Sequence, residues 1–370
     1  MIPKNEIIAA QIANRCCRRC FQDTGNIQSI MEECCKTLQI TVPNLICCET
    51  MAKNFSAFYL RKEPYLIYDS CLTESLFLYD NILDTKVKSE DIEKFFYKLI
   101  GEELIRNGDY LHCMYFSGKY SKLEYSFEKQ ITPSHILNQL SCQNYFLLAH
   151  ELAHLSLHGK GYIEIPDKYK QFLNISFRRL SEYSRKGRDE KDFLVDRYYY
   201  FLDKCPENLD TYYSMLPQSN RYRHFVEECY CDFRGIQLLL ENYAGEIDSA
   251  YAISNVLNYL ITQEFIRNDL KDGLLDIANH HKDATLPVYL SALRLQMLLI
   301  TMQFNHLTYV SETLQEIQSC FSLTDYWNEF IQKLPLAESF AQLSDENIPN
   351  IDKKLLIDTL IERFYYCHFN

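Results

Sequence analysis

The most informative part of the sequence is TPSHILNQLSCQNYFLLAHELAHLSLHGKG, residues 132–161. It opens with Thr132 and Pro133, a pair typical of a helix start, because threonine caps free backbone N–H groups and proline suits the first helical position. It closes with Gly159-Lys-Gly161, which favours helix termination. The segment between them is apolar and strongly helical in pattern, so we predict one long helix that ends at residue 157 or 158.

A His-Glu-x-x-His motif lies within this predicted helix, formed by His150, Glu151 and His154. Residues four apart lie one turn apart on the same helix face, so the two imidazoles can bind one zinc ion at roughly 2.0–2.1 Å. Glu151 lies beside the first ligand and is placed to take a proton from water. The alternative is a pair of ordinary histidines on a partly buried helix, each satisfied by its neighbours.

A catalytic zinc site needs a third protein ligand and an open position for water. His158 continues the series, but it lies about 6 Å further along the helix axis than His154, so we do not expect it to bind the same ion. A better candidate is Glu228 on a second predicted helix, where Asp232 lies one turn further on the same face. Glu228 would bind the metal and Asp232 would hold a ligating histidine by its other ring N–H. Glu227 is the rival ligand.

These segments together resemble the gluzincin peptidases, especially the ImmA/IrrE type. Leu148-Ala-His-Glu-Leu-Ala-His-Leu155 resembles their active-site helix, and Glu228-Cys-Tyr-Cys-Asp232 resembles their downstream Glu-x-x-Ala-Asp element. The resemblance implies a zincin-like catalytic core, a Zn²⁺ cofactor held by the two histidines and the later glutamate, an aspartate that helps them, and the motif glutamate as base. The sequence departs from the pattern at Ala153, where glycine is usual, and in a longer insert between the two segments.

The fold is predicted to be mainly α with a small β-sheet, an α+β zincin-like core followed by a helical C-terminal region. Gly and Pro number only 10 each, which is few for a loop-rich all-β protein. Short apolar segments at 44–49 and a hairpin at 56–68 are typical of strands. Helical periodicity covers about 4–20, 26–38, 71–83, 89–107, 220–242 and a series from 246 to 366.

We divide the chain into three regions. They are an N-terminal helical region (1–43), a zincin-like metallopeptidase domain (44–245), and a C-terminal helical region (246–370). Residues 162–219 are polar, charged and rich in tyrosine, and form an insert within the central domain. This insert is expected to be a solvent-exposed elaboration, a lid or a wall that selects substrate.

Composition and charge exclude several classes of protein. The net charge is −12 and no Lys/Arg-rich stripe is present, which disfavours nucleic-acid binding, because neutralising phosphates needs clustered cations. The 15 cysteines are irregularly spaced and do not resemble a disulfide framework. The stretch from Val288 to Phe304 is the best membrane candidate, but Arg294 and Gln296 interrupt it. With no secretory signal recognised at the start, we expect a cytoplasmic protein with reduced thiols and no membrane span.

These observations predict a zinc-dependent endopeptidase that hydrolyses peptide bonds of an intracellular protein target. Glu151 would take a proton from water and pass it to the leaving amine. His224 and Tyr230 are candidates for stabilising the oxyanion, and Tyr162 and Arg234 are further ones. The alternative function is a helical binding or sensor protein with a structural or vestigial zinc site. A base beside a ligand argues against this alternative, because a structural site has no use for one.

Overall fold

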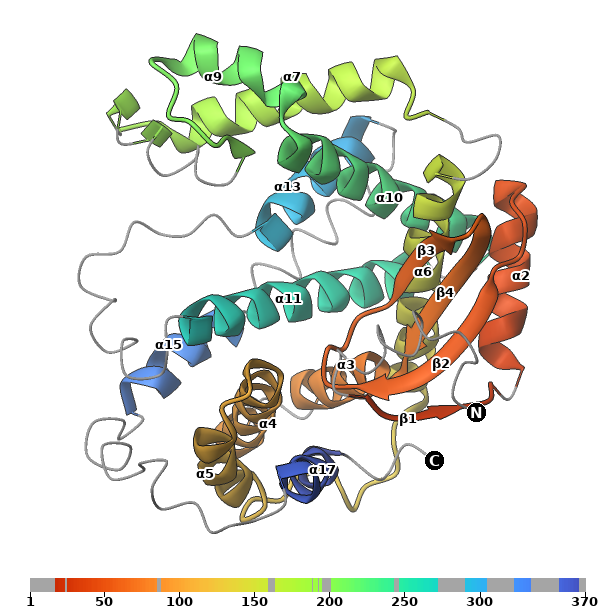
Figure 1. Cartoon of the computed structure of the whole chain (residues 1–370), viewed down its shortest axis with the longest axis vertical. Coiled ribbons are helices and arrows are strands. Elements are labelled where there is room, and N and C mark those ends of the chain that lie inside the picture. Colours follow the sequence, from red (N-terminus) through yellow and green to blue (C-terminus); the bar gives the residue numbers. More distant parts are fainter. Residues whose placement is uncertain are drawn as a thin grey trace.

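The computed structural model describes residues 17–23, 25–84, 88–158, 164–187, 189–191, 193–194, 201–242, 246–271, 290–304, 323–333 and 353–365. In this part of the chain the molecule is mainly helical and contains one small mixed sheet (Figure 1). The predicted fold class, mainly α with a small β-sheet, is therefore confirmed.

The sheet places four strands in the order β1-β2-β4-β3. Their bounds are β1 Cys17–Phe21, β2 Asn44–Thr50, β3 Ser56–Leu60 and β4 Glu63–Asp69. The predicted hairpin is formed by β3 and β4, which pair antiparallel, whereas β2 and β4 run parallel. Since β4 inserts between β2 and β3, strand β3 is left at one edge of the sheet. This edge faces the helix that carries the His-Glu-x-x-His motif.

The α-helices make up most of the rest of the described structure. They are α2 Asn26–Leu38, α3 Ser70–Asp84, α4 Ser89–Asn107, α5 Tyr110–Tyr120, α6 Ser134–His158, α7 Asp167–Ser184, α9 Leu209–Met215, α10 Asn220–Asn242, α11 Glu246–Lys271, α13 Leu290–Phe304, α15 Leu323–Lys333 and α17 Lys353–Phe364. Figure 1 shows α2 and α6 beside the sheet, with α7, α9 and α10 at one end of the molecule and α4, α5 and α17 towards the other.

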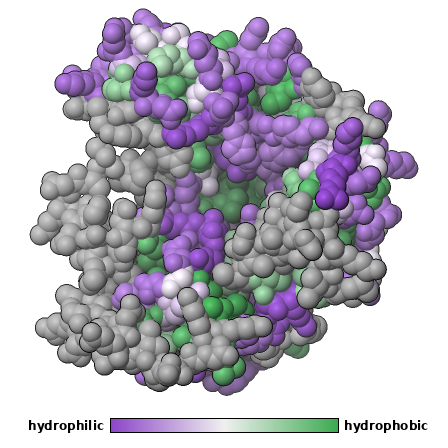
Figure 2. Space-filling view, viewed as in Figure 1, coloured by the Kyte–Doolittle hydropathy of each residue, from purple (hydrophilic) through white to green (hydrophobic). Residues whose placement is uncertain are grey.

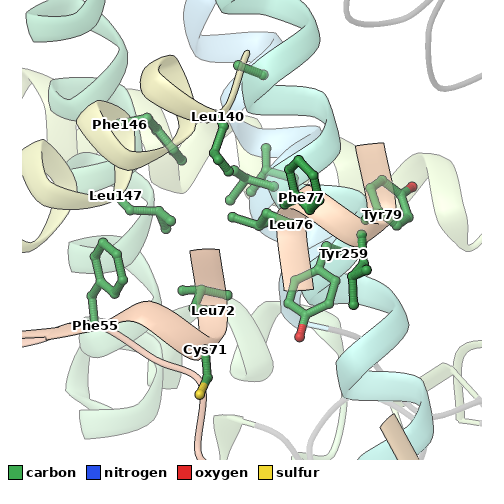
Figure 3. Packing of buried hydrophobic residues seen from close by; sticks show 14 of the residues in the cluster. Phe55, Cys71, Leu72, Leu76, Phe77, Tyr79, Leu140, Phe146, Leu147 and Tyr259 are labelled. Atoms are coloured by element: carbon green, nitrogen blue, oxygen red, sulfur yellow. The ribbon is translucent and has the colours of Figure 1, made fainter. Parts of the chain in front are cut away.

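The motif helix, α6, forms where the sequence predicts it. Its first turn is closed by the backbone N–H of Ile136, which donates to the carbonyl oxygen of Pro133 at 3.1 Å. Figure 3 shows Leu72 and Leu76 of α3 packed near Leu140 and Leu147 of α6. Because α6 is covered by neighbours on most sides, its motif is held in a rigid frame.

The main hydrophobic core is continuous across both boundaries that the sequence suggests between regions. It includes Met31 of α2 and Phe364 of α17, both fully buried, together with residues of α6. A second cluster gathers residues of α7, α10 and α13, among them Phe177 and Met297. The division into regions 1–43, 44–245 and 246–370 stays a prediction, but α2, α11 and α17 all pack into the same core.

One expectation is wrong in the N-terminal region. Helical periodicity predicts a helix over about 4–20, yet Cys17–Phe21 form strand β1; residues 1–16 lie outside the described residues. Strand β1 pairs antiparallel with β2, and Glu49 of β2 forms ion pairs with Arg18 and Arg19 at 2.6 and 2.8 Å. Pairing and charge across the sheet therefore override a local helical pattern.

The described surface is mainly hydrophilic on the face drawn in Figure 2, and hydrophobic residues show in scattered patches, one of them in a recess near its middle. None of the described helices combines the length and the apolar character that crossing a membrane requires. The apolar stretch that begins near Val288 belongs in part to α13, which packs against α10 and α11. Its hydrophobic residues thus serve packing between helices.

Candidate metal centre

Two neighbouring helices, α6 and α10, bring three potential metal donors together. His150 and His154 lie on α6 and Glu228 lies on α10. The Nε2 atoms of the two histidines are 3.2 Å apart. Oε1 of Glu228 is 3.2 Å from Nε2 of His154, and its Oε2 is 3.5 Å from Nε2 of His150. The three residues thus form a triangle of donor atoms.

The size of this triangle matches the geometry of a zinc site. Zinc binds imidazole nitrogen and carboxylate oxygen at roughly 2.0–2.2 Å in tetrahedral geometry, so its ligand atoms lie roughly 3.3 Å apart. The two Nε2 atoms are separated by close to that value, and each histidine lies at a similar distance from one of the two Glu228 oxygens. These side chains therefore present one face of a tetrahedron and leave the fourth position for another ligand.

Each histidine also contacts a carboxylate through its other ring nitrogen. Nδ1 of His150 is 3.0 Å from Oδ1 of Asp232, the aspartate that the sequence predicts as its helper, but the contact lacks hydrogen-bond geometry. Nδ1 of His154 is 2.7 Å from Oε1 of Glu227. Such contacts fix the tautomer and the ring orientation of metal-binding histidines. Both Nε2 atoms are consequently directed towards Glu228.

Glu227, the rival ligand in the sequence analysis, lies on the opposite side of the His154 ring from the donor triangle. Its Oε1 also contacts Nε2 of His158 at 2.6 Å, so His154, His158 and Glu227 form a second group of potential ligands. The separations of 2.7 and 2.6 Å are those of hydrogen bonds and are shorter than a tetrahedral edge. Glu227 is therefore better described as a partner that orients His154, and His158 lies outside the donor triangle, as expected.

Arg294 of α13 also belongs to this centre and is not expected there from the sequence. Its Nε and Nη2 contact Oδ2 and Oδ1 of Asp232 at 2.9 and 2.6 Å, and its Nη1 contacts Oε2 of Glu228 at 2.9 Å. The available signal was a charged residue within an otherwise apolar stretch, because such a residue needs a buried partner of opposite charge. The sequence did not say where along 370 residues that partner lies.

The charged groups of the centre shift one another's pKa values. Burial by itself raises the pKa of Glu228, but Arg294 and the two imidazoles outweigh burial and hold that pKa well below its usual range. Burial lowers the pKa of His154, yet its hydrogen-bonding partners, chiefly Cys231 and the two glutamates, raise it overall. Ionised carboxylates thus surround the imidazoles and favour positive charge between them.

The motif glutamate, Glu151, is held by the edge strand of the sheet. The backbone N–H of Ala57 in β3 donates to Oε2 of Glu151 at 2.8 Å. The hydroxyl of Tyr59, two residues further along β3, donates to the carbonyl oxygen of Leu155 in α6 at 3.2 Å. Strand β3 is therefore fixed against α6 beside the motif.

The candidate oxyanion donors differ in their surroundings. His224 is 69% exposed and its Nε2 is 3.5 Å from Oε1 of Glu228, so it lies near the donor triangle. Tyr230 packs against Tyr169 of α7, and its neighbours include Ala153 and Leu157. Arg234 bonds to Gln237 on its own helix, and Tyr162 lies outside the described residues. His224 is thus the one of these candidates that contacts a potential metal ligand.

Comparison with known proteins adds nothing to these observations, because no protein family, curated protein or solved structure gives a significant match to the chain.

Proposed function

We propose that this chain is a zinc-dependent endopeptidase, a hydrolase that cleaves peptide bonds of a protein target. The observation that carries the proposal is the donor triangle of His150, His154 and Glu228, whose separations of 3.2 to 3.5 Å suit a tetrahedral metal. Zinc is the favoured ion because two imidazoles and one carboxylate are typical ligands of catalytic zinc.

The catalytic roles follow from where the side chains lie. His150, His154 and Glu228 would hold a zinc ion, which would supply the Lewis acidity to polarise the scissile carbonyl and make water more acidic. Glu151 is the general base: it takes a proton from the attacking water and transfers it to the leaving amine. The Ala57 N–H limits the orientations that Glu151 can adopt. His224, as an exposed imidazole near Glu228, is the favoured donor to the developing oxyanion.

An extended substrate can add to the sheet at strand β3, an arrangement known as β-augmentation. Strand β3 is the edge strand on the side of α6. The N–H of Ala57 points towards α6, and backbone groups alternate in direction along a strand. Tyr59 therefore directs its own N–H and carbonyl to the same edge, where a peptide chain could pair with them. Such pairing would place the peptide beside Glu151 and the donor triangle.

The compartment we propose is the cytoplasm, with an intracellular protein as target. Among the described residues, Cys34, Cys47 and Cys71 are buried as free thiols. Burial raises the pKa of the Cys47 thiol to about 12, mainly by desolvation, so this thiol stays protonated and unreactive. Buried cysteines without disulfide partners are characteristic of proteins in a reducing compartment.

The direct test separates metal binding from catalysis with three variants. Purified wild type should contain one zinc ion per chain and should cleave an unstructured protein such as reduced, alkylated casein. Glu151→Gln should retain zinc and lose cleavage, whereas Glu228→Gln should lose both. Glu182→Gln, a matched change at a half-exposed site on α7, should behave as wild type. Cleavage that survives in Glu151→Gln would reject the assigned base.

The alternative, a helical binding or sensor protein with a structural or vestigial zinc site, is less well supported. A structural zinc site is usually closed by four protein ligands, whereas here the donor triangle contains three. Glu151 is also held by Ala57 beside that triangle. Zinc at full occupancy without cleavage of any peptide would favour the alternative.

A further inference from the structure

A cavity of about 410 Å³ lies next to the metal centre and is not used by the mechanism above. Its walls come from three places: the end of α6, α10, and the insert between them. Leu157, Ile165, Pro217, Tyr222 and Val226 supply apolar surface. A volume of this size falls within the range of roughly 300–1,000 Å³ that is typical of ligand pockets.

The cavity and the metal centre share a wall. Glu227 and His158 line the cavity, and the same Glu227 oxygen contacts His154, one of the metal donors. His154 is thus in contact both with this wall and with the other metal donors. An extended peptide backbone advances about 3.3 Å per residue, so the side chain that would enter the cavity belongs to a residue close to the scissile bond.

Three of the charged groups that line the cavity have polar partners. Glu227 contacts two histidines, and Nζ of Lys170 is 3.5 Å from Asp167. The Arg223 guanidinium donates to Oδ1 of Asn220 at 2.5 Å. Because these groups already have partners, an additional charge gains little there, and the apolar walls provide the main binding surface.

The far wall of the cavity is rigid. Asn174 of α7 accepts a hydrogen bond from the Tyr222 hydroxyl at 2.9 Å. Val226 and Tyr222 belong to the second hydrophobic cluster, together with Phe177 of α7. A preformed apolar pocket binds an apolar group without the cost of first ordering its walls.

We propose that this cavity is a specificity pocket that takes one large apolar side chain of the peptide substrate, aromatic or branched aliphatic. The inference rests on the proposed peptidase function and extends it by naming the substrate class. The insert that follows α6 then acts as a wall that selects substrate, because Ile165 and Asn174 belong to it.

The experiment compares peptides that differ at a single position. A mixture of unstructured peptides is digested, the cleavage sites are read by mass spectrometry, and kcat/KM is measured for matched pairs. Phe or Leu should be preferred over Ala by about tenfold or more at one position within two residues of the cut, as expected for burial of a large apolar group. Acidic residues at that position should be disfavoured.

Three variants test whether the cavity is responsible. Ile165→Trp narrows the cavity and should reduce the preference for Phe over Ala to less than threefold. Val226→Ala enlarges it and should shift the preference towards Trp. Ile175→Trp is the matched control, since Ile175 is 53% exposed on α7 and does not line the cavity. Zinc content and far-UV circular dichroism show whether each variant is folded.

A binding measurement separates this inference from the proposed function. Zinc-loaded Glu151→Gln is titrated with fluorescent peptides that carry Phe or Ala, with and without Ile165→Trp. Tighter binding of the Phe peptide that disappears in Ile165→Trp supports the pocket, whether or not wild type cleaves any peptide. If wild type cleaves nothing, only the proposed peptidase function is rejected. If both Ile165→Trp and Val226→Ala cleave with the same preference for Phe over Ala as wild type, the proposed pocket is rejected but the peptidase function is not. If neither cleavage nor binding shows any preference for Phe over Ala, the pocket is also rejected.

Discussion

Arg294 offers the sharpest test of how the metal centre is held together. Its guanidinium makes three contacts of 2.6 to 2.9 Å with the carboxylates of Asp232 and Glu228. Asp232 has a side chain only 1% exposed. Replacement of Arg294 by methionine keeps much of the volume and the apolar stem but removes the charge. Two carboxylates, one of them fully buried, then lose a partly buried cation.

The magnitude follows from the burial of this pair. Removing one partner of a buried ion pair costs about 3–5 kcal/mol, because the other charge remains buried without compensation. A surface pair contributes about 0–1 kcal/mol, and Arg178, whose side chain is 52% exposed beside Glu182, provides that comparison. Without metal we therefore expect Arg294→Met to lose several kcal/mol of unfolding free energy and Arg178→Met to lose less than one.

Zinc should recover part of the loss in Arg294→Met. A divalent cation in the donor triangle lies beside Glu228 and replaces some of the missing positive charge. Urea unfolding with chelator and with excess zinc gives the two free energies for each protein. A metal-free loss no larger than that of Arg178→Met would refute the argument. So would a loss that zinc leaves unchanged, because the deficit would then not arise from charge at the metal centre.

Further predictions concern the partners of the metal ligands, the sheet edge and one buried acid. Glu227→Gln should weaken zinc affinity by about 10-fold to 100-fold, since Glu227 orients His154. His158→Ala should leave zinc affinity within about threefold of wild type. Competition with a fluorescent chelator measures both affinities. Ala57→Pro should retain zinc but lower kcat by roughly tenfold or more, because the donor to the catalytic base is removed. Burial raises the pKa of Asp80 from 3.8 to about 7. Between these two pH values the folded state keeps a proton that the unfolded state releases. The free energy of unfolding should therefore fall by roughly 4 kcal/mol as pH rises from 4 to above 7. Asp80→Asn should lack this fall and exceed wild type in unfolding free energy at pH 8, and an equal pH slope in both proteins would contradict the assignment.

The part of the centre that could be predicted from the sequence is the part encoded by helical spacing. His150 and His154 lie on one face of α6 because they are four residues apart, and the same rule places Glu228 and Asp232 together on α10. Spacing also excluded His158 from the donor triangle, although it could not show that His158 contacts Glu227. Local periodicity thus identifies which residues share a face.

Contacts between distant segments are where the sequence was insufficient. Whether Glu227 or Glu228 faces the histidines depends on how α10 is rotated against α6, and one residue changes the direction by about 100°. The sheet gives a second example of a distant contact that local sequence does not reveal. The pairing of strand β1 with β2 outweighs a local helical pattern. Each of these outcomes is decided by a partner that lies far away in the chain.

The contribution of α13 has a consequence for how the chain is divided into functional parts. The sequence suggests a metallopeptidase domain that ends at residue 245, yet Arg294 lies beyond that boundary and contacts both Glu228 and Asp232. A fragment that ends at 245 would keep the donor triangle but leave the buried carboxylate of Asp232 without Arg294, at a cost of about 3–5 kcal/mol. Because net protein stability is only about 5–15 kcal/mol, α13 is better regarded as part of the candidate metal centre than as part of an appended region.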